Sequence, residues 1–360
     1  MSKMASTPGE RKAMLRRQFL AQTLRTSGLS VFPATVQHIS GFRSAEPVRA
    51  PRLISVRGEL NPSEIGIMLP HEHIMSLFGG EITQSDNADY DREELFSAVI
   101  PYLKRIRKLG CRTIADCTTA YFGRAPLLLR EISEATDMNI LTNTGYYGAV
   151  NDRYVPAHAY RDSAEDLARL WIAEFQKGIG ESGIRPGFIK IAVDLGPLSQ
   201  IDAKIVRAAA LAHLETGLTI ASHTGASVEA VSDQLKILAE EGVDNTAWIW
   251  VHAHSVTSPE LLVEHARQGV WIELDGINSE AMERDLRVIV AMREQGLLRR
   301  LLLSHDGNSF RFGGRPPNPY EALFTHFVPF LKKNDFSKEE IRLLIEENPV
   351  RAFSVKVRLS

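Results

Sequence analysis

From about residue 52 onward, short apolar runs alternate with longer stretches in which apolar residues recur every three or four positions. The short runs indicate eight buried strands, at 66–69, 113–116, 140–144, 188–193, 219–223, 248–254, 270–274 and 301–306. The spacing between them predicts helices at 92–109, 164–178, 203–215, 228–241, 259–267 and 280–295. Because parallel strands need a crossover that is usually a helix, we predict an α/β fold, the (β/α)8 or TIM barrel. A doubly wound open sheet is the alternative, but no Gly-x-Gly-x-x-Gly segment joins a strand to a helix.

Composition narrows the class of protein. The chain has 360 residues, of which 44% are hydrophobic and 24% charged, as in folded globular proteins. Its 42 basic and 44 acidic residues leave a net charge of -2, too little to hold a polyanion, so we expect no nucleic-acid partner. The two cysteines, Cys111 and Cys117, are too few for a disulfide framework, and we expect them to be buried. Any metal must therefore be held by histidines and carboxylates.

The first 50 residues differ from the rest and are expected to be a leader outside a single domain at 51–360. A basic start is followed by Arg16-Arg17-Gln18-Phe19-Leu20, which resembles the core of a twin-arginine export signal. This predicts export to the periplasm, with a disordered leader on a cytoplasmic protein as the alternative. No stretch of the chain has 18 consecutive apolar residues, so we expect no membrane span.

Polar residues fall where the predicted strands end. In a TIM barrel the carboxyl ends of the strands form one active face, so these residues should converge into one site. They are His71, His73, Asp116, Lys190, His223, His252, His254, Asp275 and Asp306.

The strongest metal-binding element is His71-Glu72-His73, because strand residues two apart point the same way and two imidazoles can share one divalent cation. Lys190 lies inside an apolar run, where an ammonium must be paired, neutralised or chemically changed. Addition of carbon dioxide would turn its amine into an anionic carbamate able to bridge two cations. An outward-pointing lysine at a strand end is the alternative for this residue.

Several segments together resemble the phosphotriesterase family, a branch of the amidohydrolase superfamily of metal-dependent hydrolases. The resemblance covers roughly residues 52–352. Its motifs are Gly66-Ile67-Met68-Leu69-Pro70-His71-Glu72-His73-Ile74, Gly187-Phe188-Ile189-Lys190, Ser222-His223-Thr224, Ala253-His254-Ser255, Leu274-Asp275-Gly276 and Ser304-His305-Asp306.

The resemblance implies a set of metal ligands. His71, His73 and Asp306 would hold the more buried cation, a carboxylated Lys190 would bridge, and the outer cation would lie on His223 and His254. His254 is preferred to His252 because it lies nearer the carboxyl end and is followed by Ser255, as in the family pattern. His252 and His305 are then expected to be structural.

The implied reaction is hydrolysis by a hydroxide shared between two divalent cations, with Asp306 taking the proton. Zinc is expected, although Mn, Fe and Co suit the same ligands. In phosphotriesterases the proton leaves through an aspartate three residues after the last metal histidine; here that position is Thr257, which disfavours fast paraoxon-like hydrolysis. Tyr147 stands where lactonase-like relatives carry tyrosine and phosphotriesterases tryptophan, so a lactone or carboxylic ester is the expected small-molecule substrate, with a phosphoester as the alternative.

Other interpretations stay open at this point. A mononuclear deaminase of the same superfamily would lack Lys190, and a metal-free binding barrel would be expected to have lost a ligand. In the loop at 307–319, Arg311 and Arg315 could meet an anionic part of the substrate or simply be solvated. The oligomeric state is undetermined, with a homodimer among the alternatives.

Overall fold

The computed structural model describes residues 51–78, 90–311, 313 and 315–360. The expected leader at 1–50, with its Arg16-Arg17 pair, lies outside the described residues.

The strands form one closed parallel ring, as predicted. The order β6-β7-β8-β9-β10-β11 makes one run and β12-β3-β4-β5 the other. The runs join because Thr142 alone separates β5 from β6, and three residues separate β11 from β12. The strands are β3 (Ile67–His73), β4 (Cys111–Asp116), β5 (Asn139–Leu141), β6 (Asn143–Thr144), β7 (Phe188–Ala192), β8 (Ile220–His223), β9 (Trp248–Val251), β10 (Trp271–Leu274), β11 (Leu301–Leu303) and β12 (Gly307–Asn308).

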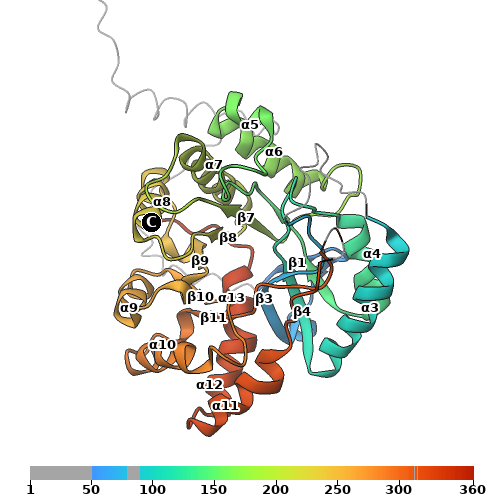
Figure 1. Ribbon diagram of the computed structural model, residues 1–360. Coiled ribbons are helices and arrows are strands. Elements are labelled where there is room, and N and C mark those ends of the chain that lie inside the picture. The colour runs from blue at the N-terminus through green and yellow to red at the C-terminus, as the bar shows by residue number, and fades with distance from the viewer. Residues whose placement is uncertain (1–50, 79–89, 312, 314) are drawn as a thin grey trace, which may run out of the picture. The chain divides into compact units, whose positions relative to one another are not determined.

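Helices surround this ring of strands (Figure 1). They are α3 (Arg92–Lys108), α4 (Pro126–Thr136), α5 (Ala157–Arg161), α6 (Ala164–Lys177), α7 (Gln200–Thr216), α8 (Val228–Glu241), α9 (Pro259–Arg267) and α10 (Met282–Glu294). The carboxyl-terminal helices are α11 (Val328–Lys333), α12 (Lys338–Arg342) and α13 (Asn348–Phe353); a short helical segment precedes α11 and another joins α12 to α13. Before the barrel, β1 (Leu53–Ser55) and β2 (Gly58–Leu60) form an antiparallel hairpin, followed by α2 (Pro62–Ile65).

Local sequence fixes where these helices begin and end. The hydroxyls of Ser199 and Ser227 accept hydrogen bonds from the first turns of α7 and α8, which satisfies amide groups that lack a partner within the helix. Gly217 and Gly242 end the same helices with φ of 73° and 80°, a left-handed conformation that glycine adopts without strain. Helices α8 and α9 have the bounds predicted from periodicity.

Alternation along β7 separates two apolar layers. Ile189 and Ile191 pack in the outer core between strands and helices, whereas Phe188 packs inside the barrel. Lys190 is in phase with Phe188, so its side chain also points into the barrel. The strand register therefore brings a lysine to the site.

The differences from prediction are local. Helix α4 was not predicted, and the strand predicted at 248–254 ends at Val251. Cys111 and Cys117 are buried and free, as expected. Within the described part of the chain, no helix is both long enough and apolar enough to cross a membrane.

Candidate metal centre

Six polar residues converge at the carboxyl ends of the barrel strands. They line a cavity of about 230 Å³ and lie on β3, β7 and β8 or within three residues of the ends of β9 and β11: His71, His73, Lys190, His223, His252 and Asp306. Five of the six were predicted ligands. The structure brings these five together but replaces His254 by His252.

His71, His73 and Asp306 form a first group of possible ligands. Both histidines point inward from β3, two residues apart, and Asp306 Oδ1 lies 3.3 Å from Nε2 of His71 and 3.2 Å from Nε2 of His73. The three donor atoms lie within 4.8 Å of one another, which suits one shared cation. Burial alone would raise the pKa of Asp306, but the hydrogen bonds from His71 and His73 hold it well below its usual value. The aspartate is therefore an anion.

His223 and His252 form the second group. His252 Nε2 lies 2.7 Å from His223 Nδ1, so both nitrogens face the same space. The hydroxyl of Tyr147 lies 3.1 Å from His223 Nδ1. Burial, then the charges of His252 and Lys190, keep the pKa of His223 well below its usual value. A neutral imidazole is the form that binds a cation.

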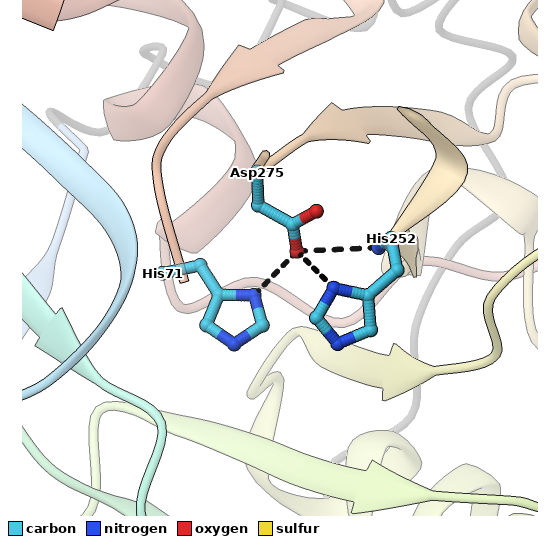
Figure 2. Close-up of side chains that lie close together, drawn as sticks. All are labelled: His71, His252 and Asp275. Atoms are coloured by element: carbon cyan, nitrogen blue, oxygen red, sulfur yellow. Dashed lines mark hydrogen bonds and ion pairs between the residues drawn. The ribbon is translucent and has the colours of Figure 1, made fainter. Parts of the chain in front are cut away.

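Asp275, directly after β10, orients the histidines from behind (Figure 2). Its Oδ2 accepts from Nδ1 of His71 at 2.7 Å and from Nδ1 of His252 at 2.9 Å. The main-chain N–H of His252 donates to the same oxygen at 3.2 Å (Figure 2). If both rings are neutral, these bonds place their proton on Nδ1 and leave Nε2, which faces the cavity, to bind a cation. The group His71, His252 and Asp275 also has metal-ligand spacing, but its nitrogens are already used as donors to the carboxylate.

Lys190 is buried at 1% exposure without a carboxylate partner. Its Nζ donates to Ile191 O at 3.4 Å, and no Asp or Glu oxygen of the described residues lies within 4.0 Å of it. After burial itself, the Lys190 charge is among the causes that lower the pKa of His73 and of His223, so the amine lies near both groups of ligands. An unpaired ammonium here would face a high desolvation cost.

Glu72 and His305 lie outside the cavity and form a hydrogen bond with each other. Glu72 points away from its two histidine neighbours, and its Oε1 accepts from His305 Nδ1 at 2.7 Å and from Ser304 Oγ at 2.8 Å. The N–H of Gly307 donates to its other oxygen at 2.7 Å. The structural role expected for His305 is confirmed by these bonds.

The structure corrects the choice between His254 and His252. Strand β9 ends at Val251, and His252 has a left-handed φ of 64°, so the alternation of side chains stops there. His254 lies on the following turn, where its Nδ1 donates to Asp275 Oδ1 at 2.7 Å, and it does not line the cavity. Three residues after His252 stands Ser255, so neither this position nor Thr257 supplies a carboxylate.

Five cavity residues had no sequence signal of their own. Phe78, Phe122 and Val150 give the wall an apolar side with Tyr147, whose ring stacks on Phe122 at 4.8 Å. Asn308 and Asn318 add polar groups to the lining. Only their place just after strands or in loops at the active face could have pointed to them.

A parallel barrel with paired histidine and carboxylate groups at its carboxyl ends defines a metal-dependent hydrolase. The model of the phosphotriesterase family matches residues 51–353, and the chain belongs to this family. The chain is 29% identical to a phosphotriesterase homology protein of Mycobacterium tuberculosis, over 84% of its own length and 98% of the relative's. It is 28% identical to an aryldialkylphosphatase of Saccharolobus solfataricus, over 83% and 98%.

Comparison of structures gives the same family. A solved structure described as organophosphate hydrolysis activity engineered from a weak promiscuous lactonase template superposes with a TM-score of 0.75. It is 27% identical and covers 84% of this chain and 100% of its own.

Proposed function

We propose that this protein is a binuclear hydrolase that cleaves a small lactone or carboxylic ester. The observation that carries the proposal is that both groups of ligands line one cavity with a buried lysine, which has no carboxylate partner among the described residues. Four histidines, Asp306 and a carboxylated Lys190 would hold two divalent cations, and His252 takes the place first given to His254.

Formation of the carbamate balances the charge of the site. The Lys190 ammonium would first lose a proton, and the neutral amine would then attack carbon dioxide, forming an N–C bond and releasing a second proton, so a cation becomes an anion. Two divalent cations bring +4 into one pocket, and neutral histidines offset none of it. The carbamate and Asp306 supply about -2 of the balancing charge.

When bound, such cations polarise a carbonyl oxygen and lower the pKa of water toward neutrality. The protein's own residues would move the proton. Asp306 faces the cavity as an ionised acceptor and would take the proton from the attacking water. Water adds to the carbonyl carbon, the C–O bond breaks, and the proton passes to the leaving oxygen to give an acid and an alcohol.

Tyr147 and the cavity size support a carbonyl substrate. Burial raises the pKa of Tyr147, so its hydroxyl stays protonated and can donate a hydrogen bond to a carbonyl oxygen. A cavity of about 230 Å³ is smaller than the ~300–1,000 Å³ typical of drug-sized ligands. A planar carbonyl with two substituents needs less room than a phosphorus centre with four.

The relatives' names keep phosphotriester hydrolysis as the second candidate. The deciding experiment is a panel of lactones, carboxylic esters and phosphate triesters with metal-loaded protein, together with metal analysis. We expect close to two ions per chain and the highest kcat/KM on a lactone or ester. Preference for phosphotriesters would favour the second candidate. One ion per chain would support a mononuclear enzyme, and absence of metal binding would overturn both.

A further inference from the structure

The cavity lining includes an arginine that the hydrolytic chemistry does not use. Arg311 lines the cavity together with the metal-binding residues. Its Nε is buried and has no hydrogen-bond partner, and no carboxylate of the described residues lies within 4.0 Å of its guanidinium. A guanidinium stays charged at any physiological pH, so this cation lacks a counter-ion in the part of the chain that the structure describes.

The surrounding backbone holds Arg311 in place. Its main chain bridges to Ser76 just beyond β3 and to Arg315 across the loop, and the N–H of Ser76 donates to Phe310 O at 3.0 Å. At the base of the loop, Asn308 and Asn318 exchange main-chain hydrogen bonds of 2.7 and 2.8 Å. The side chain is thus presented from a paired backbone close to Asp306, which lowers the ordering cost of binding.

An apolar surface shapes the position of the guanidinium. Its Cζ lies 5.7 Å from the centre of the Phe78 ring, so one side of the group rests against an aromatic wall. A planar fork of N–H donors facing a cavity fits a carboxylate, which can accept two parallel hydrogen bonds.

We propose that Arg311 is a specificity-determining residue that binds a carboxylate on the substrate, so that the natural substrate is a small anionic lactone or ester. This inference rests on the proposed function for the reacting bond. Arg311 does not touch the reacting atoms; it selects which esters are held against them.

The test compares a γ-butyrolactone that bears a ring carboxylate with the same lactone bearing a carboxamide. The two probes share the reacting bond and differ in charge. With metal-loaded protein, kcat/KM should be at least ~10-fold higher for the carboxylate, because a charge-assisted hydrogen bond is worth roughly a factor of ten or more. This ratio should fall to about one in Arg311→Met and to an intermediate value in Arg311→Lys, which keeps the charge but loses the fork.

Arg315 provides the matched control, since it lies on the same loop but is exposed and does not line the cavity. Arg315→Met should keep the wild-type ratio. Equal ratios in wild type and Arg311→Met, or the same fall in Arg315→Met, would overturn the inference.

A second readout does not depend on turnover. The ring-opened hydroxy diacid and its monoamide both offer one carboxylate to the metals, but only the diacid has a second for Arg311. The diacid should raise the unfolding temperature of metal-loaded wild type and Arg315→Met more than the monoamide does, and this difference should vanish in Arg311→Met. If no ester or lactone is cleaved, the proposed function fails while this difference still decides the role of Arg311; equal protection by both compounds in wild type overturns it.

Discussion

At the scale of a single residue, the proposed carboxylation of Lys190 would change its charge to suit its surroundings. An amine at 1% exposure, close to four histidines and without a carboxylate partner, is poorly solvated as an ammonium. The same burial protects a carbamate once two cations compensate its charge. The proposed site therefore requires a primary amine at this position, because only an amine can form the carbamate.

Replacement of Lys190 by Ala should remove the bridge between the two ligand groups. We expect turnover to fall by more than ~10–100-fold, which is the usual loss when a residue that only hydrogen-bonds to a metal ligand is replaced. Added bicarbonate or a short carboxylate should restore part of it by filling the vacated space. Steady-state rates with and without the additive measure this rescue. A native mass measurement should also show about 44 Da above the unmodified chain for wild type alone.

Lys190→Arg is the control for this prediction. Its guanidinium stays charged and fills the same space, so the additive should not rescue it. Rescue of the arginine variant, or full activity of Lys190→Ala, would contradict the carbamate.

Asp275 acts through the two histidines that it orients. Its carboxylate accepts from Nδ1 of His71, His252 and His254, and only an anion with two oxygens can serve all three. Asp275→Asn keeps the shape but turns one acceptor into a donor. We expect metal affinity to fall by ~10–100-fold, measured by competition with a chelator, with activity partly restored by excess metal.

The neighbouring Glu273→Gln is the matched comparison. Its Oε2 lies 3.2 Å from His71 Nδ1, a longer contact than that of Asp275, and its Oε1 has no partner. Its effect on metal affinity should be smaller. Equal effects of the two substitutions would mean that Asp275 has no special positioning role.

At the scale of elements, the end of β9 decides which histidine reaches the site. The strand stops at Val251, His252 turns into a left-handed conformation, and the next three residues form a tight turn. A prediction from periodicity continues a strand for as long as apolar and polar residues alternate, so it could not show that this strand stops at Val251. The same pattern placed His71 and His73 on one side of their strand, but it left both orientations of Lys190 open, and the structure decides this by putting Lys190 in phase with Phe188.

His252→Ala and His254→Ala therefore separate the two assignments. We expect His252→Ala to lose about one ion per chain and most activity, because it removes a ligand that faces the cavity. His254→Ala should keep close to two ions and lose activity only modestly, since it removes one of the donors to Asp275. Metal analysis after dialysis measures both, and the reverse pattern would restore His254 as the ligand.

At the scale of the whole molecule, the barrel was more predictable than the cavity walls. Strand and helix periods recur along the chain and need only local information, whereas Phe122 and Val150 reach the cavity from turns that carry no period. Metal ligands lie between these extremes, since they sit on strand ends whose order is fixed by the barrel. The chemistry of these residues limits which of them can bind a metal, but the turn after each strand decides which of them face the cavity.

Metals bound at the barrel mouth should stabilise the entire domain. The proposed ligands come from β3, β7 and β8 and from the ends of β9 and β11, so the unfolded chain cannot present them together. Binding to the folded state alone adds about 2.7 kcal/mol when free metal exceeds its Kd by ~100-fold. For a domain of about 300 residues this corresponds to a rise in unfolding temperature of ~4 °C per site. Calorimetry before and after chelation, with metal loss confirmed by elemental analysis, should show that drop and its recovery when the ions are returned. An unchanged unfolding temperature in the stripped protein would mean that these histidines do not hold metal.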